Sequence, residues 1–286
     1  MNSEELTALY NNMLLLGDVK TPNVLELDDC VLVYDKALGW GLRRFADGIL
    51  KNERLIDFGE GISFIENPRL FRGNKVVTHI HAPGLKYIPD GAFADCSDLM
   101  VVYADNVTLV GNNAFKDCKK LSQVGFSSLE HVGSEAFAGC ISLSSVEFPN
   151  LRFLEDKAFI NCVGLKYIKF PKLQQVGDYA FMSCQKLFSC ECPNVQTVGF
   201  GAFTHCDSLC RMELPNLTTA SKAFVKCKSL QTVRMPSLIL NRLDVISECS
   251  NLQTLEVYSV KNSTDIKKRF PRLSSITVRG KRFKLK

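Results

Sequence analysis

The cysteines are the residues of this 286-residue chain whose type and spacing most directly suggest chemistry. Of twelve cysteines, eight recur every 22 residues, with one interval of 21: Cys96, Cys118, Cys140, Cys162, Cys184, Cys206, Cys227 and Cys249. Asn52 and Asn74 precede this series on the same grid. Thiolates bind zinc and paired thiols form disulfides, so both uses have to be compared with a purely structural one.

The regular spacing favours buried structural thiols. Ligands repeated along one line do not converge on a tetrahedral centre, and a disulfide requires a Cβ geometry that a repeating ladder does not offer. Cysteine can instead serve as a small apolar residue with a weak S–H donor. Cys190 and Cys192 occupy inward positions of the pattern, whereas Cys210 points outward, as a reactive thiol or an ordinary surface cysteine. We expect all twelve thiols to be free and no metal to be bound.

Other catalytic chemistry has little support in the sequence. The four histidines are His79, His81, His131 and His205, and the chain contains no GxSxG, Walker, HExxH or paired CxxC motif. His79 and His81 are two residues apart and could share a metal ion, but no third ligand is identifiable. We therefore expect no enzymatic activity and no cofactor.

The cysteines belong to a repeat that must position every other side chain. Seven units contain Ala-Phe-x-x-Cys, as at Ala158, Phe159 and Cys162, and a leucine follows each cysteine after three residues. Apolar residues six and eight positions after the cysteine, such as Ile168 and Phe170, alternate with others, which is typical of a short strand with one buried face. A proline often ends the strand, and a second apolar pair leads back to Ala-Phe. This period predicts a solenoid with parallel strands about 4.8 Å apart and a phenylalanine spine.

The unit LSSVEFPNLRFLEDKAFINC, residues 143–162, and its copies resemble the leucine-rich repeat family, most closely its BspA-like class. We expect an α/β repeat solenoid, a curved right-handed superhelix with one parallel sheet on the concave face and short turns or 3-10 segments on the convex face. The resemblance implies a strand face that commonly binds other proteins. It also implies a class that often supplies microbial surface proteins or adhesins.

The expected organisation is an N-terminal capping segment at 1–44, repeats at 45–260 and a basic C-terminal capping coil and tail at 261–286. SEELTALYNNMLLL, residues 3–16, predicts a helix, and CVLVYD, residues 30–35, predicts a strand or a worn repeat. Residues 261–286 hold ten lysines and arginines against one aspartate, a balance of +9, so the other residues carry −4 of the total of +5. The basic tail comprises Arg279, Lys281, Arg282, Lys284 and Lys286. It is either a solvated end or a contact for an acidic protein, a nucleic acid or an anionic membrane.

Two stretches of the predicted strand face are candidates for binding a partner. The first gathers apolar and aromatic side chains with two histidines: Thr78, His79, His81, Met100, Val101 and Tyr103. An N-terminal cap covering this patch is the alternative interpretation. The second is a row of mostly alternating charges that includes Lys169, Glu191 and Arg234. That row is either a self-neutralising ladder or a groove for a charged peptide.

These observations favour a non-catalytic scaffold or adaptor that binds a protein through its strand face. No stretch approaches 18 consecutive apolar residues, so no transmembrane helix is expected. The first 18 residues carry two glutamates where a secretory signal would carry positive charge, which favours a cytoplasmic protein. The alternative is a microbial surface adhesin or host-interaction factor exported without a recognisable signal peptide.

Overall fold

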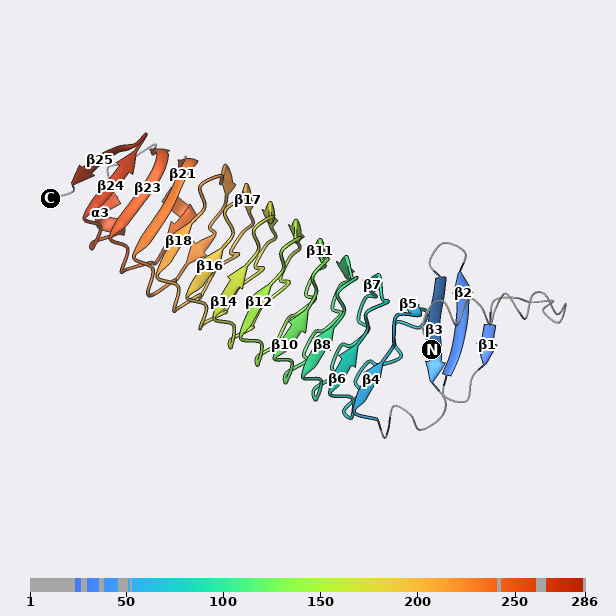
Figure 1. Cartoon of the computed structure of the whole chain (residues 1–286). Helices are drawn as coiled ribbons and strands as arrows, with labels where there is room; N and C mark the ends of the chain where they lie inside the picture. The colour runs from blue at the N-terminus through green and yellow to red at the C-terminus, as the bar shows by residue number, and fades with distance from the viewer. Residues whose placement is uncertain are drawn as a thin grey trace.

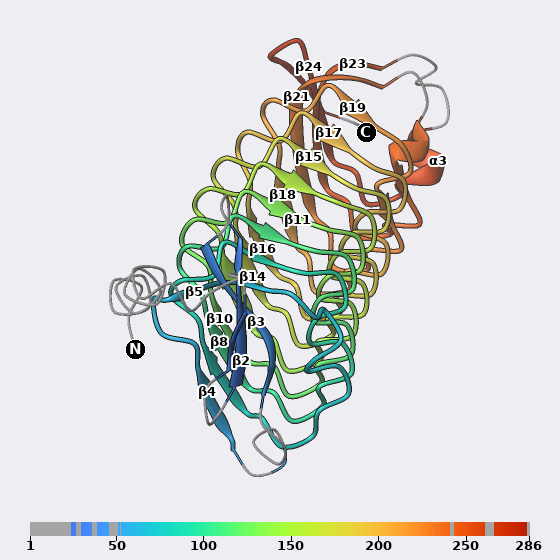
Figure 2. The same ribbon diagram turned by 90° about the vertical axis from the view of Figure 1, so that its right-hand side faces the viewer.

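The computed structural model describes residues 24–26, 30–35, 39–45, 51, 53–240, 243–260 and 266–284. They form an elongated solenoid in which successive coils stack along one axis, with the N- and C-terminal segments at opposite ends (Figure 1). The view turned by 90° shows each coil as one turn of the chain stacked on the next (Figure 2). The predicted repeat solenoid with parallel strands is confirmed.

One row of strands runs along the solenoid, and we call its solvent-exposed side the strand face (Figure 1). The row comprises β4 (Leu55–Asp57), β6 (His79–His81), β8 (Val101–Tyr103), β10 (Gln123–Gly125), β12 (Ser145–Glu147), β14 (Tyr167–Lys169), β16 (Ser189–Glu191), β18 (Arg211–Glu213), β21 (Thr232–Leu240), β23 (Thr254–Val260) and β24 (Ser275–Val278). Most of the three-residue strands bury the middle residue, such as Val146 or Ile168, and leave at least one flanking residue exposed. The predicted alternation is therefore present.

A second parallel sheet occupies the return segments of seven successive coils. Its strands are β7 (Tyr87–Ile88), β9 (Leu109–Val110), β11 (His131–Val132), β13 (Phe153–Leu154), β15 (Gln175–Val176), β17 (Thr197–Val198) and β19 (Thr219–Ala220). This second sheet lies where the sequence predicts short turns or 3-10 segments. Two-residue strands are too short to show an alternating pattern in sequence. Their pairing is visible only once the coils are stacked.

Helical structure is scarce in the described part of the chain. Its named helical elements are a 3-10 turn, η1 (Leu243–Val245), and a short helix, α3 (Ile266–Arg269). Two further short strands, β20 (Phe224–Val225) and β22 (Ile246–Ser247), pair in parallel at the corner that precedes the cysteine.

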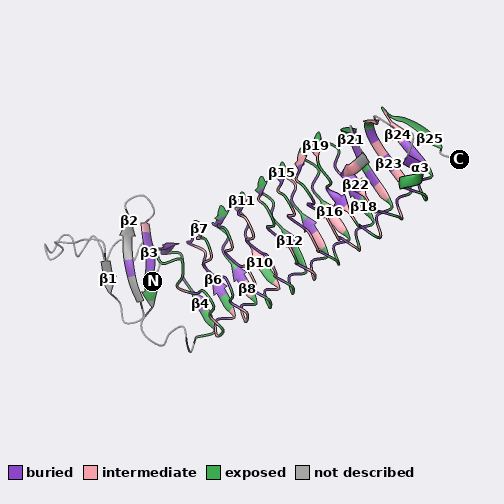
Figure 3. Ribbon diagram, turned by 180° about the vertical axis from the view of Figure 1, so that it is seen from behind, coloured by how far each residue is buried: buried purple, intermediate pink, exposed green. Residues whose placement is uncertain are grey.

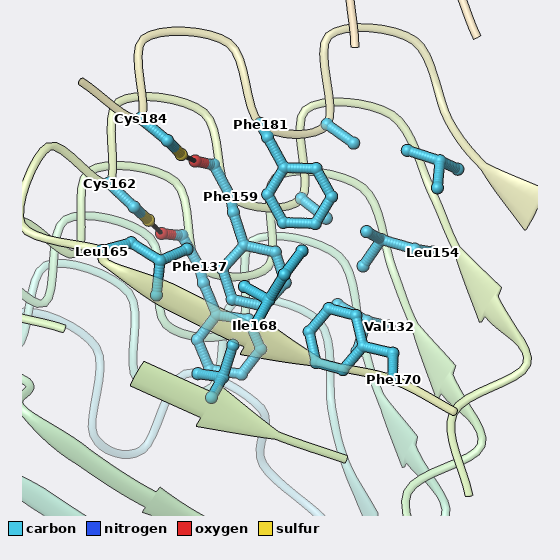
Figure 4. Close-up of a cluster of buried hydrophobic side chains, with 14 of the residues drawn as sticks. Val132, Phe137, Leu154, Phe159, Cys162, Leu165, Ile168, Phe170, Phe181 and Cys184 are labelled. Atoms are coloured by element: carbon cyan, nitrogen blue, oxygen red, sulfur yellow. Dashed lines mark hydrogen bonds between the residues drawn. The ribbon is translucent and has the colours of Figure 1, made fainter. Parts of the chain in front are cut away.

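The core is built around the predicted phenylalanine spine (Figure 4). The ring centroids of Phe137 and Phe159 lie 4.9 Å apart, and those of Phe159 and Phe181 lie 5.5 Å apart, with nearly parallel planes. All three side chains are fully buried. Such rings combine a large buried apolar area with favourable stacking, so the spine links each coil to both of its neighbours.

The cysteine series lies beside this spine and makes a second ladder. Each thiol donates a hydrogen bond to the backbone carbonyl of the phenylalanine in the preceding coil, for example from Cys162 Sγ to Phe137 O at 3.0 Å (Figure 4). The same contact is formed by Cys96, Cys118, Cys140, Cys184, Cys206, Cys227 and Cys249. Asn74 occupies the slot one coil earlier, where its Oδ1 accepts the N–H groups of Val76 and Val77. The residues found in this slot thus share a small side chain that forms hydrogen bonds with backbone groups.

The N-terminal end carries a four-stranded sheet in the order β1 (Val24–Glu26), β2 (Cys30–Asp35), β3 (Gly39–Phe45) and β5 (Ile62–Ile65). β1, β2 and β3 are antiparallel, and β3 pairs in parallel with β5, so this sheet lies against the first coil. Trp40 and Leu42 are buried there. CVLVYD is a strand, as predicted, whereas the helix predicted for residues 3–16 lies outside the described residues.

The first coil departs from the predicted 22-residue grid. β4 pairs with β6 so that Asp57 stands opposite His81, a step of 24 residues. The ring of Phe71 packs on Phe93 at 5.0 Å, which restores the step of 22. Two extra residues therefore lie between β4 and Phe71. Asn52, which the grid placed in the cysteine slot, lies outside the described residues.

The C-terminal end closes with a β-hairpin. β24 pairs in parallel with β23, and β25 (Lys281–Lys284) turns back antiparallel to β24. Arg279 and Gly280 form the turn, and both have positive φ, as a two-residue hairpin requires. The repeat therefore continues through β24, and the basic tail forms a strand up to Lys284, while Lys286 lies outside the described residues.

Candidate functional site

The predicted partner surface on β4, β6 and β8 is assembled as one patch. The strand register places Leu55, His79 and Val101 side by side in one row, and Asp57, His81 and Tyr103 side by side in the next. Leu55 is 59% exposed, Tyr103 46% and Met100 41%. Figure 3 marks exposed segments along this row of strands. Thr78 and Val101 are half-buried, and His79 and His81 are exposed. We call Leu55, His79, His81, Met100, Val101 and Tyr103 the apolar patch.

Leu55 is the member of the apolar patch that the sequence did not identify. A step of 22 residues back from His79 leads to Asp57, whereas the observed step of 24 puts Leu55 opposite His79 and Asp57 opposite His81. The sequence could not reveal this shift of register, because this coil lacks a clear Ala-Phe-x-x-Cys motif from which the position of its strand could be counted.

Tyr103 is held in place by its neighbours. A Cβ atom added to Gly125 would lie 2.5 Å from Tyr103 Cδ1, so the ring lies directly over the glycine backbone of β10. The hydroxyl of Tyr103 donates a long hydrogen bond of 3.4 Å to Gln123 Oε1. An aromatic ring fixed in this way loses little conformational entropy when a partner covers it.

The two histidines of the apolar patch have polar partners. His81 Nδ1 lies 3.1 Å from Asp57 Oδ2, and His79 Nδ1 lies 2.8 Å from the hydroxyl oxygen of Thr78. Partial burial opposes the ionisation of Asp57. Hydrogen bonds from the Gly59 N–H and His81 outweigh it, so the pKa of Asp57 lies below its usual value. These contacts make the exposed side of β6 polar, between Leu55 on β4 and the side chains of Val101 and Tyr103 on β8.

The charged row shows two different arrangements. Around Arg234 it is self-neutralising, because Nε lies 2.7 Å from Glu256 Oε2 and Nη1 lies 3.5 Å from Glu213 Oε1. The hydrogen bond to Glu256 and the nearby carboxylate charges raise the pKa of Arg234. Lys169 stands in register between Glu147 and Glu191. Together with Glu191 and Glu213 it lines a cavity of about 310 Å³ that also includes Pro171, Pro193 and Pro215.

The second sheet carries a polar cluster that sequence analysis missed. His131 Nε2 lies 2.6 Å from Glu155 Oε1, while the Ser134 hydroxyl donates to Glu155 Oε2 at 3.0 Å. The cluster borders a cavity of about 510 Å³ that also includes Phe153 and Asp178. The signal available in sequence was Glu155 itself, which replaces the glycine found at the equivalent turn position in the coils before and after it.

The basic tail is anchored at two points. The guanidinium of Arg279 lies 5.5 Å from the ring centroid of Tyr258, and Arg282 Nη2 donates to Ser275 Oγ at 3.3 Å. Lys281, Arg282, Phe283 and Lys284 are all exposed. The tail therefore presents its charges from a defined strand.

The cysteines are placed as the repeat indicated. Eleven fall in the part of the chain whose side chains are described, and all eleven are free, with Cys210 exposed, Cys190 half-buried and the others buried. Burial raises the pKa of Cys96 to about 11 and that of Cys162 to about 12. These thiols are protonated at neutral pH, which suits a structural role.

Within the described residues, no group of three or more histidine, cysteine, aspartate or glutamate side chains is arranged to hold a metal ion. No helix in the same residues has the length and apolar character needed to cross a membrane.

Comparisons with known proteins agree with this geometry. A family model described as "BspA type Leucine rich repeat region (6 copies)" matches residues 65–188 and 174–277. A leucine-rich repeat protein from Bacteroides ovatus has a similar structure, with a TM-score of 0.58 and 17% identity over 89% of this chain and 76% of that one. A leucine-rich cell surface protein from Faecalibacterium prausnitzii has a TM-score of 0.52 and 18% identity over 90% of this chain and 89% of that one. A search of curated proteins found no match.

Proposed function

We propose that this chain, which belongs to the BspA-type leucine-rich repeat family, is a non-catalytic scaffold that binds a protein partner through the apolar patch. Repeats of this family generally serve as protein-interaction scaffolds. The observation that carries the proposal is the exposure of Leu55, Met100 and Tyr103 within three successive coils of one face, with His79 and His81 on the strand between them. Exposed apolar and aromatic side chains that gather with polar ones on one face are typical of a protein interface.

The apolar patch is suited to act as the energetic centre of that interface. Tyr103 is a large side chain already fixed over Gly125, so its burial costs little ordering. His79 and His81 on β6 and Asp57 on β4 offer polar contacts beside it. The charged row contributes less, because Arg234 is already paired within the chain, whereas Lys169 and Glu191 border an open cavity that a partner's polar side chain can enter.

We place this scaffold in the cytoplasm. The support is the state of the described cysteines, all of which are free, since disulfides are rare in reducing compartments and frequent in oxidising ones. The alternative is a microbial surface adhesin, which the description of the Faecalibacterium prausnitzii protein as a cell surface protein favours. Fractionation of the native cells distinguishes the two locations.

The decisive experiment compares two exposed apolar side chains, one in the apolar patch and one outside it. A partner is first captured with the full chain and identified by mass spectrometry, and its affinity is then measured for Tyr103→Ala and Ile141→Ala. The two side chains are almost equally exposed, at 46% and 44%. We expect Tyr103→Ala to weaken binding by about 1–3 kcal/mol, mainly through faster dissociation, and Ile141→Ala to have little effect. Equal affinity of Tyr103→Ala and the wild-type chain would remove the apolar patch from the interface.

A further inference from the structure

Among the described strands, β25 is the terminal one of a five-stranded sheet. The order β18-β21-β23-β24-β25 ends there, and β25 lies at the C-terminal end of the solenoid (Figure 1). A terminal strand offers unpaired backbone N–H and C=O groups to any extended segment that reaches it.

The hairpin geometry identifies which backbone groups are offered. A two-residue turn is closed by a pair that exchanges both of its backbone hydrogen bonds, here Val278 with Lys281. Hydrogen-bonded and non-hydrogen-bonded pairs then alternate along the hairpin. The backbone N–H and C=O groups of Phe283 therefore form hydrogen bonds with Ile276 of β24. The backbone N–H and C=O groups of Arg282 and of Lys284 point away from β24.

The side chains of β25 divide between two faces. Arg282 stands beside Thr277, and Lys284 stands beside Ser275, so both extend the rows of the strand face. Phe283 stands beside Ile276 on the opposite face, where Phe283 remains 51% exposed. The edge thus combines outward backbone groups, two cations on one face and one large apolar side chain on the other.

We propose that β25 binds an extended acidic segment of a partner protein by strand addition. Backbone groups of the segment pair with those of Arg282 and Lys284. Its acidic side chains lie next to the Arg282 and Lys284 side chains, and an apolar side chain between them packs on Phe283. The preferred sequence alternates acidic and apolar residues, because successive side chains of a strand point to opposite faces.

The positive charge of the C-terminal segment favours an acidic partner segment over a second copy of this chain as the occupant of the β25 edge. Residues 261–286 carry +9, so two β25 strands paired about a two-fold axis would place basic side chains against basic side chains. Like charges directly opposite each other are destabilising in a sheet. A nucleic acid or anionic membrane would be attracted to the same charge, but neither uses the outward backbone groups or the apolar face that Phe283 provides.

The test uses a fluorescein-labelled peptide of alternating glutamate and valine with the full chain. Arg282→Pro removes the outward N–H and the charged side chain without removing a backbone hydrogen bond to β24, whereas Arg282→Ala removes the side chain alone. Both variants lose the side-chain hydrogen bond to Ser275, so the comparison between them isolates the N–H. We expect both variants to bind the peptide more weakly than wild type. Arg282→Pro should be weaker than Arg282→Ala by about fivefold, the effect of one backbone hydrogen bond. Equal affinities of the two variants would overturn strand addition.

Changes in the peptide provide a readout that does not depend on the folding of a variant. N-methylation of alternate peptide amides should abolish binding in one register and spare it in the other. A peptide of the same composition with its glutamates in one block should bind at least fivefold more weakly, since it cannot place valine on Phe283. Equal binding of all these peptides, or tighter binding of an oligonucleotide or anionic vesicle, would show a purely electrostatic contact. Self-association of the chain that Arg282→Pro abolishes would instead assign the edge to a second copy.

This inference is separate from the proposed function. Tyr103→Ala should leave the binding of the alternating peptide unchanged, because Tyr103 lies on β8, far along the solenoid from β25 (Figure 1). Loss of peptide binding in Tyr103→Ala would show that the peptide binds the apolar patch and not the edge.

Discussion

The thiol of Cys162 donates a hydrogen bond of 3.0 Å to the carbonyl oxygen of Phe137, which lies 25 residues earlier in the chain. The same oxygen accepts the N–H of Cys140 in its own coil at 3.2 Å. One buried carbonyl is therefore satisfied by two consecutive coils, through the backbone of one and the side chain of the next. This contact explains why a cysteine, and not only a small apolar residue, recurs once in every coil.

Removal of the Cys162 thiol should measure that contact. We expect Cys162→Ala to lower the free energy of unfolding by about 1–2 kcal/mol, because a buried hydrogen bond is lost and a small void is left. Cys210→Ala is the matched control, since Cys210 is exposed and should tolerate the change. Denaturant unfolding of both variants measures the difference. Equal stability of the two variants would show that the Cys162 thiol contributes nothing measurable to stability.

Native thiol reactivity should separate Cys210 from the buried series. Burial raises the pKa of Cys162 and of Cys192 to about 12, so neither forms a thiolate at pH 8. Iodoacetamide followed by peptide mapping should label Cys210 rapidly and the buried cysteines only after denaturation. Twelve alkylated cysteines are expected in non-reducing denaturant. Labelling of Cys162 in the native protein at the rate of Cys210 would contradict this assignment.

The phenylalanine spine should be more sensitive in its centre than at its end. Phe159 is fully buried and stacks on Phe137 and on Phe181, whereas Ile266 lies in α3 near the last coil. Phe159→Ala should cost about 3–5 kcal/mol of stability, as large cavities usually do, and Ile266→Ala should cost less. Reversible denaturant unfolding provides the comparison. A cost for Ile266→Ala that matches that of Phe159→Ala would argue against a spine in which each coil depends on two neighbours.

The polar cluster on the second sheet should make stability depend on acidic pH. Partial burial opposes ionisation of Glu155, but hydrogen bonds from His131 and Ser134 outweigh it, and the pKa of Glu155 is lowered. A carboxylate whose pKa is lowered by folding stabilises the folded state at pH values above the pKa that it has in the unfolded chain. This contribution is lost as the pH falls through the pKa of the folded state. Glu155→Gln should therefore be less stable than wild type at pH 7 and nearly equal to it at pH 3. A difference that stays constant between those pH values would exclude this ionic contribution.

The sequence by itself determined the structure of the single coil and which of its positions point into the core. Because each repeat packs only on its neighbours, the same inward positions recur every 22 residues, and Phe159, Cys162 and Ile168 could be assigned to the core from the sequence alone. The outward positions of Met100 and Tyr103 followed from the same period. The identity of a bound partner left no trace in that pattern, because exposed positions are free of the packing constraint that makes a repeat recognisable.

Only the tertiary structure decided the features that depend on how coils of unequal length are stacked. The two extra residues before Phe71 move Leu55 into the apolar patch, and the short return segments of successive coils pair into a second sheet that brings Glu155 to His131. The reversal at Arg279 and Gly280 turns a run of basic residues into an edge strand. In each case the deciding interaction joins residues on separate strands, through a register or a turn that the Ala-Phe-x-x-Cys period does not encode, so local pattern alone could not reveal it.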